Sequence, residues 1–294
     1  MKFVIDLVFN YDKLYNGGVI ALHKLAYELA VRGNTVYIFC EPEYKHKNII
    51  VIPYDRNKIS YEWNNNLTNI DYIFTEDTIS IYPEIRKGNP FNTKKVARWI
   101  LSDKPFPETK KTYSESDVYF LYEDTYTNSS LKSISKLTVF DDNLDKLYVT
   151  NNNNRKGYCH ILHKNTPENH HNILTKYNSK DLSDWKLKGL WDYLRNEFNK
   201  FEYFITFDDR TYYSTAAALC GCKSIVIPVE NNKEKYINPS DFRMKNPNQM
   251  VGISYGFDDI NWTETTKDLV RTFIEDRKKI NNKTVDNFID YWKK

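Results

Sequence analysis

Apolar positions in the first half of the chain alternate between short continuous runs and helical spacing. Residues 3–9 form an apolar run that ends in a turn, which predicts a buried strand. Residues 19–29 place apolar side chains at helical spacing, and Gly33 follows as a left-handed cap, which predicts a helix. Short β-branched or aromatic runs follow at residues 35–40, 49–53, 71–74, 118–122 and 137–140. Strands that alternate with helices indicate a parallel sheet with helices on both faces.

The second half of the chain repeats this alternation. Its predicted strands are residues 158–163, 203–207, 224–228 and 251–255, and its predicted helices are residues 187–198, 211–219, 267–280 and 285–292. Residues 151–154 are all asparagine, which favours turns and does not fill a core, so we expect the interdomain linker there. The predicted fold class is therefore α/β, with two α/β halves.

The composition narrows the class of protein. Hydrophobic residues make up 40% of the chain, and 42 basic against 39 acidic residues give a net charge of +3. That balance is too even to favour nucleic acid or a membrane surface as the main partner. No apolar run approaches the roughly 18 residues of a membrane span. The cysteines at positions 40, 159, 220 and 222 are irregularly spaced, which predicts reduced thiols in a cytoplasmic compartment and no zinc site.

A glycine turn follows the first predicted strand. Gly17 and Gly18 precede the first helix, and ligands of open α/β sheets bind at this kind of strand end. The two glycines let a ligand approach the backbone, and the helix start offers N–H groups to an anion. The turn has neither the dinucleotide fingerprint nor the ending of a phosphate loop. A plain tight turn is the alternative, and His23 is expected to be a packed histidine.

The segment from residue 75 to residue 101 carries candidate catalytic groups. Asp77 and Glu84 follow the predicted strand 71–74, and a carboxylate at the carboxyl end of a strand can take a proton from a hydroxyl. Arg98 lies in a predicted helix over residues 96–101. It either holds a phosphate or carboxylate, or pairs with Glu84 for structure. Loop carboxylates that cap their own turns are the alternative for both acids.

The second half contains a candidate phosphate site. The strand 203–207 runs into Asp208 and Asp209, and a helix rich in small residues follows. Asp209 suits the N-cap position, while Thr211, Ser214 and Thr215 place hydroxyls and N–H groups at the positive end of the helix. That combination binds phosphate without a metal. An ordinary capped helix is the alternative.

Two further interpretations concern the charged residues Asp208, Asp209 and Lys164 near this site. Asp208-Asp209 is similar to the acidic pair with which metal-dependent sugar transferases hold Mn²⁺, but it lies in the second half, after a complete α/β unit. Lys164 ends the strand 158–163 and faces the same site, where it would neutralise a diphosphate leaving group. An exposed charge is the alternative for Lys164.

Three blocks of sequence resemble a known family. They are YPE-x3-GNP from residue 82 with VARWIL from residue 96, FDDRT from residue 207 with AAALCGCKSIVIP from residue 216, and GISYG from residue 252. Together they resemble a family of GT-B glycosyltransferases found in bacterial surface-polysaccharide clusters and large DNA viruses. The resemblance covers most of the chain, in order.

The resemblance implies two Rossmann-like domains facing across a cleft. Residues 1–150 would bind the acceptor, residues 151–275 the nucleotide sugar, and a helix within residues 276–294 would pack back on the first domain. The positions that match the family's donor site or line its pocket are Gly17, Gly18, Lys164, Asp209, Thr211, Ser214 and Tyr255. Arg210 departs from the pattern, because the family often has proline there, and at 294 residues the chain is shorter than most GT-B enzymes.

The expected function is transfer of a hexose or pentose from a UDP-, GDP- or dTDP-sugar to a hydroxyl of a glycan acceptor, without a metal or other cofactor. In an inverting reaction Asp77 or Glu84 would be the base; in a retaining one they would orient sugar hydroxyls, with Arg98 supporting acceptor or phosphate. The expected location is the cytoplasm, of the host for a viral protein. The alternatives are a sugar-nucleotide epimerase on the same fold and a catalytically silent glycan-binding subunit.

Overall fold

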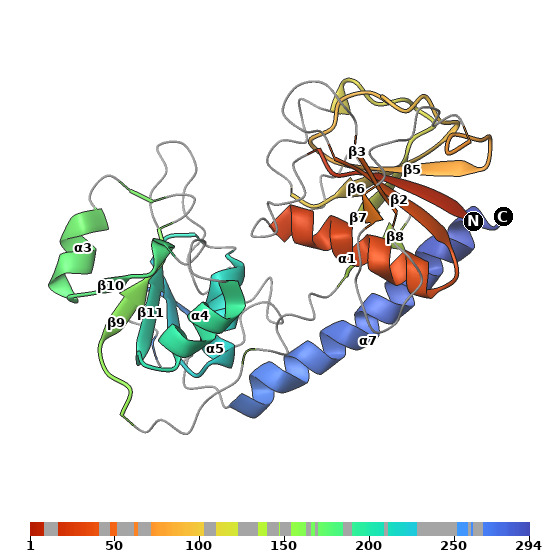
Figure 1. Cartoon of the computed structure of the whole chain (residues 1–294). Helices are drawn as coiled ribbons and strands as arrows, with labels where there is room; N and C mark the ends of the chain where they lie inside the picture. Colours follow the sequence, from red (N-terminus) through yellow and green to blue (C-terminus); the bar gives the residue numbers. More distant parts are fainter. Residues whose placement is uncertain are drawn as a thin grey trace. The chain divides into compact units, whose positions relative to one another are not determined.

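The computed structural model describes residues 1–8, 17–40, 48–51, 62–63, 72–102, 110–122, 135–139, 147, 154–162, 166–167, 170–184, 190–208, 211–227, 252–257, 260 and 267–294. The chain divides into two compact units, unit 1 comprising Met1–Asp141 with Arg277–Lys294 and unit 2 comprising Asp142–Asp276. Each unit contains its own largely parallel sheet flanked by helices (Figure 1). The predicted α/β class with two Rossmann-like units is confirmed.

The described strands of unit 1 form one sheet, in the order β4 (Glu62–Trp63), β3 (Asn48–Val51), β2 (Thr35–Cys40), β1 (Lys2–Asp6), β5 (Thr78–Pro83), β6 (Lys95–Ile100), β7 (Val118–Leu121) and β8 (Ser135–Lys136). Only β3 among them runs in the opposite direction, because it pairs antiparallel with β2 on one side and with β4 on the other; all other neighbours pair parallel. The strand order reverses at β1, because β2 lies on one side of it and β5 on the other. Open α/β sheets bind ligands outside the carboxyl ends of strands at such a point.

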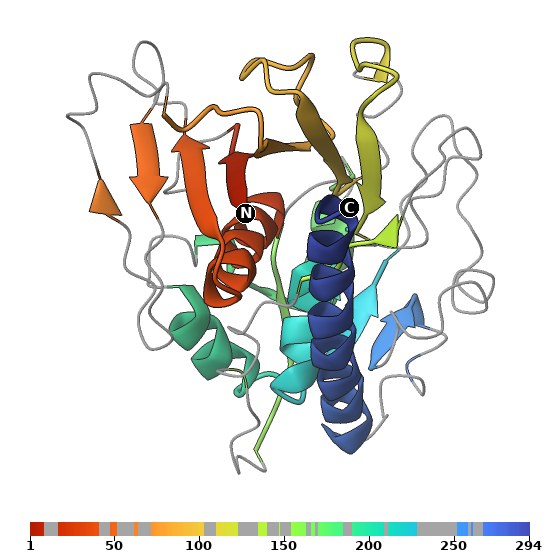
Figure 2. The same ribbon diagram turned by 90° about the vertical axis from the view of Figure 1, so that its right-hand side faces the viewer.

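Two helices cover one face of this sheet. Figure 2 shows α1 (Gly17–Val31) beside the C-terminal part of α7 (Lys267–Trp292). Phe288 of α7 packs against Phe3 and Phe120, with ring centroids 5.7 Å and 4.7 Å apart. Burial of these rings fixes the end of α7 in the core of unit 1.

The end of the chain is one helix, so the prediction of two helices over 267–280 and 285–292 was wrong. The polar residues between them contain neither glycine nor proline, and the Thr284 hydroxyl donates to the Asn281 carbonyl at 3.2 Å within the helix. The same hydroxyl accepts a hydrogen bond from the Thr138 N–H at 3.1 Å. The polar residues here reflect a side-chain contact with Thr138, which follows β8, and not a helix end.

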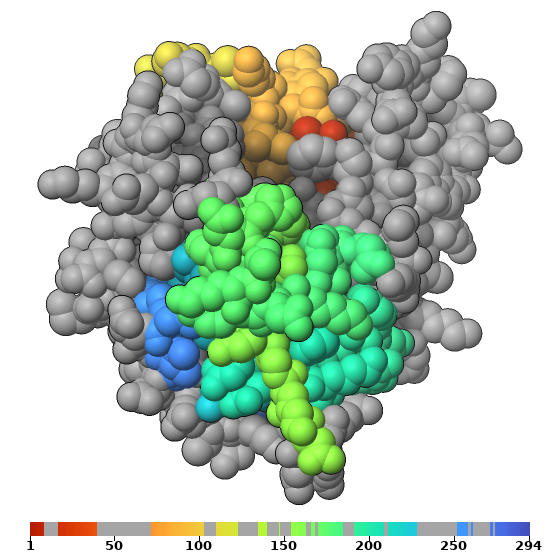
Figure 3. Space-filling model, turned by 90° about the vertical axis from the view of Figure 1, so that its left-hand side faces the viewer, coloured from red at the N-terminus to blue at the C-terminus, as the bar shows by residue number. Residues whose placement is uncertain are grey.

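The described strands of unit 2 form a parallel sheet, in the order β10 (Lys180–Asp181), β9 (Tyr158–His160), β11 (Tyr203–Thr206), β12 (Lys223–Val226) and β13 (Ile253–Tyr255). Helices α4 (Leu190–Phe198) and α5 (Tyr212–Leu219) lie on one face, and α3 (His170–Lys176) lies on the other (Figure 1). Figure 3 shows the surface of unit 2 from the side of α3. The strand order reverses at β9, between β10 and β11.

Two predicted elements in unit 1 were wrong. The strand expected at residues 71–74 is Thr78–Pro83, and the helix expected over residues 96–101 is the strand Lys95–Ile100. Both strands lie inside a parallel sheet, and their side chains are almost all buried. A strand that is buried on both faces has no alternation of polar and apolar residues, so periodicity does not separate it from a buried helix.

Candidate functional site

The first turn of α5 lies at the carboxyl edge of the unit 2 sheet. β11 ends at Thr206, and the chain enters α5 at Tyr212. Thr211 is the N-cap, with an extended backbone, and its hydroxyl accepts a hydrogen bond from the Tyr213 N–H at 3.3 Å. A helix start carries partial positive charge and exposes N–H donors to anions. The strand order also reverses close to this edge, at β9. This edge is therefore the part of unit 2 best suited to a ligand.

Ser214 adds a buried hydroxyl to this turn. Its side chain is in the first turn of α5 and the residue is only 2% exposed. In the described structure its Oγ has no hydrogen-bond partner, and neither has the Oγ of Ser224 on β12, against which α5 packs. Leaving a buried donor or acceptor unpaired costs about 1–3 kcal/mol, so such a group is unusual unless a bound molecule completes it.

The neighbouring strand ends carry a second polar group. His160 ends β9, and its Nδ1 lies 2.9 Å from the Ser179 hydroxyl. Its Nε2 lies 3.7 Å from the Asp181 carboxylate at the end of β10. Burial lowers the pKa of His160, and the Asp181 charge opposes that shift. His160 is therefore held between Ser179 and Asp181, beside the point where strand order reverses, and its burial favours the neutral form.

The remaining predicted donor residues of unit 2 are placed only in part. Tyr255 ends β13 at the same edge, and its buried ring packs with Val226 and Ile253. Thr215 is half-buried on α5. Lys164 and Asp209 lie outside the described residues. The structure thus brings Thr211, Ser214 and Tyr255 to one sheet edge, and their role in donor binding stays a prediction.

The carboxyl edge of unit 1 carries an ion pair that the sequence analysis missed. Asp6 ends β1, and its carboxylate is buried against the Arg86 guanidinium, with Nε 2.7 Å from Oδ2. The signal was present, because Asp6 is the sole charge in the apolar run 3–9. Gly17 begins α1 in unit 1, and a Cβ added there would meet no atom within 4 Å, so packing does not require glycine at this position.

Arg98 is part of the protein interior and not of a ligand site. It has no exposed surface, and its Nε donates to Asp117 Oδ2 at 2.7 Å. Its two terminal nitrogens donate to the carbonyls of Arg86 and Gly88. The guanidinium lies over the rings of Tyr82 and Tyr113 at 4.7 Å and 4.1 Å. Neither the predicted support of a phosphate or acceptor nor the alternative pairing with Glu84 fits this geometry.

The YPE and GNP residues around Arg98 also serve the fold. The Tyr82 hydroxyl donates to Asn89 Oδ1 at 2.8 Å and accepts from the Phe91 N–H at 3.0 Å. The Asn89 amide donates to the Thr93 carbonyl at 2.8 Å. These bonds fix the loop from β5 to β6. That loop places the Arg86 guanidinium beside the Asp6 carboxylate.

The two predicted bases occupy different edges of the sheet. Asp77 comes directly before β5, so it lies at the amino end of that strand, and the placement on which its prediction rested was wrong. Its side chain is 92% exposed and lies 3.6 Å from Lys95 Nζ. Glu84 follows β5 at the carboxyl edge, but it is buried and its Oε2 accepts the Leu101 N–H at 2.9 Å. Glu84 therefore joins the ends of β5 and β6.

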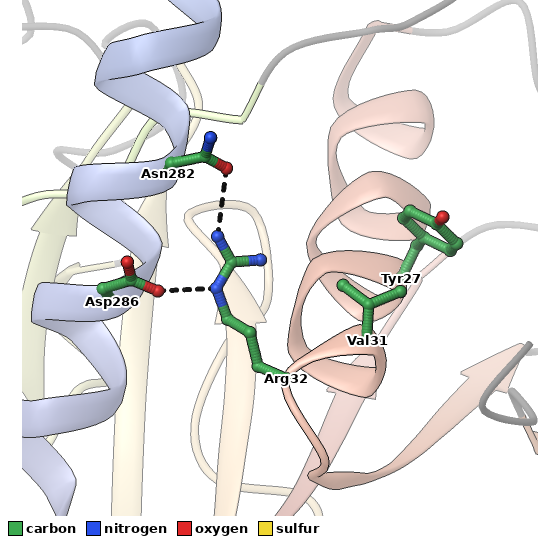
Figure 4. A pocket seen from close by; sticks show the side chains of 5 residues that line it. All are labelled: Tyr27, Val31, Arg32, Asn282 and Asp286. Atoms are coloured by element: carbon green, nitrogen blue, oxygen red, sulfur yellow. Dashed lines mark hydrogen bonds and ion pairs between the residues drawn. The ribbon is translucent and has the colours of Figure 1, made fainter. Parts of the chain in front are cut away.

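A groove of about 600 Å³ lies between α1 and α7 within unit 1 (Figure 4). Arg32, which directly follows α1, points across it, and its Nε donates to Asp286 at 2.6 Å while its Nη2 donates to Asn282 at 3.1 Å. Its Nη1 donates to Glu28 of α1. The charged groups of the groove are thus engaged with one another, which fits a brace between the helices.

Three predicted features concern metal ions, thiols and membranes. Among the described residues, no group of three His, Cys, Asp or Glu side chains is placed to hold a metal ion. Cys159, Cys220 and Cys222 are free and buried. No helix in the described ranges is both long and apolar enough to cross a membrane. The expected independence from metal and the cytoplasmic location stay predictions.

Comparison with known proteins gives structural similarity but no matching family. No family model matches the chain, and no curated protein matches it. Among solved structures, it is similar to one titled "Glycosylation Associate Protein (Gap123) complex from Streptococcus agalactiae", with 12% sequence identity and a TM-score of 0.35. The match covers 83% of this chain and 61% of that chain. A similarity of this size assigns neither a family nor an activity, so the GT-B relationship stays a prediction.

Proposed function

We propose that this chain is a glycosyltransferase that binds the diphosphate of a nucleotide sugar at the start of α5. One observation carries the proposal: the first turn of α5 lies at the carboxyl edge of a parallel sheet and holds a buried, unpaired Ser214 hydroxyl within the described structure. The positive end of the helix dipole and this hydroxyl together suit an anionic, oxygen-rich group. A nucleoside diphosphate has that chemistry, and the site needs no metal to neutralise it.

The reaction follows from such a site. The acceptor hydroxyl attacks the anomeric carbon, the bond from that carbon to the diphosphate breaks, and the diphosphate leaves with the electron pair. A helix start and a hydroxyl beside the leaving group would stabilise the charge that develops on it. The acceptor loses its proton to a base in an inverting reaction, and exclusion of water prevents hydrolysis of the donor.

Binding of nucleotides tests the proposal. Thermal unfolding is followed with UDP, GDP, dTDP and CMP and their common sugars, in EDTA and in Mn²⁺. One nucleotide class should stabilise the protein in EDTA, by about 2.7 kcal/mol at 100 times the dissociation constant. No stabilisation by any nucleotide, confirmed by calorimetry, would contradict the proposal. Stabilisation only in Mn²⁺ would restore the metal-dependent reading of Asp208-Asp209.

A catalytically silent glycan-binding subunit is the second candidate. It is favoured by the placement of the two predicted bases, since Asp77 lies at the amino edge of its sheet and Glu84 is engaged with the Leu101 backbone. The two candidates differ in turnover. A transferase releases nucleoside diphosphate from its donor when an acceptor glycan is added, whereas a silent subunit binds glycan and releases none.

A further inference from the structure

A second helix start lies beside that of α5. Trp191 is in the first turn of α4, and its ring contacts that of Tyr212, the first residue of α5, edge to face with centroids 5.3 Å apart. Helix α4 leads to the amino end of β11, so it runs from the carboxyl edge to the amino edge of the sheet, as α5 does (Figure 1). The two helices therefore begin side by side at one edge.

Trp191 brings an unpaired donor to this place. The residue is 6% exposed, and its Nε1 is buried without a hydrogen-bond partner in the described structure. The Ser214 hydroxyl, in the first turn of α5, has the same property. Indole N–H groups that are buried usually find an acceptor, because an unpaired donor there costs about 1–3 kcal/mol. The two atoms belong to the first turns of helices whose starts touch through the rings of Trp191 and Tyr212.

The chemistry of the two groups selects the ligand. An indole N–H only donates, and a serine hydroxyl donates as well as accepts, so the group that completes both must offer acceptor oxygens. The positive ends of α4 and α5 favour a negative charge on that group. An ammonium group or a metal ion would meet the indole N–H with the wrong polarity. Phosphate oxygens satisfy both requirements.

We infer that Trp191 is a further ligand-binding residue of unit 2, whose indole N–H donates to a diphosphate oxygen together with the Ser214 hydroxyl. This inference rests on the proposed function, since it places another donor in the same site. It adds α4 to the site and assigns a role to a residue whose sequence context gives no sign of one, because a tryptophan at helical spacing is ordinarily a core residue.

The chain offers a matched control in unit 1. Trp292 also has a buried Nε1 without a partner in the described structure, but it lies in the last turn of α7. The negative end of a helix repels an anion, so Trp292 should not bind phosphate. Replacing either tryptophan by phenylalanine removes one indole N–H and keeps an aromatic ring.

The experiment measures binding of inorganic pyrophosphate and of UDP, GDP and dTDP by calorimetry to the full chain. Trp191→Phe should weaken the best of these ligands about tenfold or more, the size of a lost hydrogen bond to a charged group. Ser214→Ala should weaken it as well, and Trp292→Phe should leave the dissociation constant within twofold. Circular dichroism and the melting temperature establish that each variant is folded, and Trp191→Leu, which also lacks the N–H donor, serves if Trp191→Phe does not fold.

Each result separates the two proposals. If the natural chain binds one ligand, Trp191→Phe binds it equally well and Ser214→Ala binds it more weakly, the role of Trp191 is overturned and the proposed function stands. If Ser214→Ala also binds it equally well, the placement of the diphosphate at the start of α5 fails too. Equal weakening by Trp191→Phe and Trp292→Phe also overturns it, because the effect is then not local. If the natural chain binds neither pyrophosphate nor any nucleotide, both proposals fail.

Discussion

Arg86 and Asp6 form a two-pronged ion pair at the carboxyl edge of unit 1. Arg86 Nε lies 2.7 Å from Asp6 Oδ2, and Arg86 Nη2 lies 2.9 Å from Oδ1. Asp6 Oδ1 also accepts the N–H of Val8, whose φ of 64° is left-handed and unfavourable for a β-branched residue. One carboxylate thus holds the strained turn after β1 and joins it to the loop after β5, where the strand order reverses.

Removing this arginine should destabilise unit 1 markedly. Arg86→Ala leaves a buried carboxylate without its cation, which should lower the free energy of unfolding by about 3 kcal/mol. Urea unfolding followed by circular dichroism measures the change. The exposed pair between Lys94 and Glu76 is the control, because Lys94→Ala removes a surface ion pair and should change stability by less than about 1 kcal/mol. Equal losses in the two variants would show that the Asp6 pair is no stronger than a surface pair.

Arg98 should matter for folding and not for ligand binding. Arg98→Lys keeps the charge but loses the planar group that donates to Asp117, Arg86 and Gly88 in different directions, so the unfolding free energy should fall by about 3 kcal/mol or more. Nucleotide affinity, measured by calorimetry below the melting temperature, should be unchanged because Arg98 belongs to unit 1. A loss of nucleotide affinity with an unchanged free energy of unfolding would show that Arg98 contributes to ligand binding.

These two arginines show what the sequence made predictable. The strand and helix pattern was enough for two α/β units, since propensity and spacing are local properties. The partners of Arg98 were not predictable, because Asp117 comes directly before β7, the strand that pairs with β6, and Arg98 lies in a strand buried on both faces. A motif of polar and aromatic residues looks the same whether it binds a ligand or fixes a loop.

The positions of Thr211 and Ser214 in unit 2 were easier to predict from the sequence than the position of Asp77 in unit 1. Thr211 and Ser214 follow a strand and begin a helix, so their position at a sheet edge follows from chain order alone. Trp191 reaches the same place from another helix, and that meeting depends on packing. Asp77 was misplaced because the preceding strand was predicted at residues 71–74, which moved Asp77 from the amino end of β5 to a carboxyl end.

The buried histidine of α1 should make stability depend on pH. Burial lowers the pKa of His23 to about 4, from 6.5 in an unfolded chain. Between these values the unfolded chain binds a proton and the folded chain does not, so the free energy of unfolding should fall as the pH drops from about 6.5 to about 4. The full effect is about 3 kcal/mol.

Unfolding curves at a series of pH values isolate this effect. His23→Leu should remove this part of the slope, whatever its stability at pH 7, since leucine does not titrate. An unchanged slope in His23→Leu would assign the pH dependence to other groups.

The Thr211 hydroxyl should have two separable effects. Thr211→Val removes the cap of α5, which should lower the unfolding free energy by about 1 kcal/mol. It should also weaken nucleotide binding by about 1–2 kcal/mol, because the loss of the cap disturbs the N–H groups at the proposed phosphate site. Thr211→Ser keeps the hydroxyl and should restore both. If Thr211→Val is less stable but binds nucleotide with unchanged affinity, the phosphate does not bind at this turn.

The carboxylates of unit 1 test where chemistry takes place. Asp77→Asn should leave transfer and nucleotide affinity unchanged, since Asp77 is exposed at the amino edge and ligands of a parallel sheet bind at the opposite edge. Glu84→Gln should lower stability by about 1–2 kcal/mol, because a neutral amide accepts the Leu101 N–H less strongly than a carboxylate. Transfer assays with a donor found by thermal shift, together with urea unfolding, measure both. Loss of turnover in Asp77→Asn at full stability would place the reacting groups at the amino edge and contradict the site proposed at the carboxyl edge. Loss of turnover in Glu84→Gln beyond what its stability explains would identify Glu84 as the base and set aside the silent subunit.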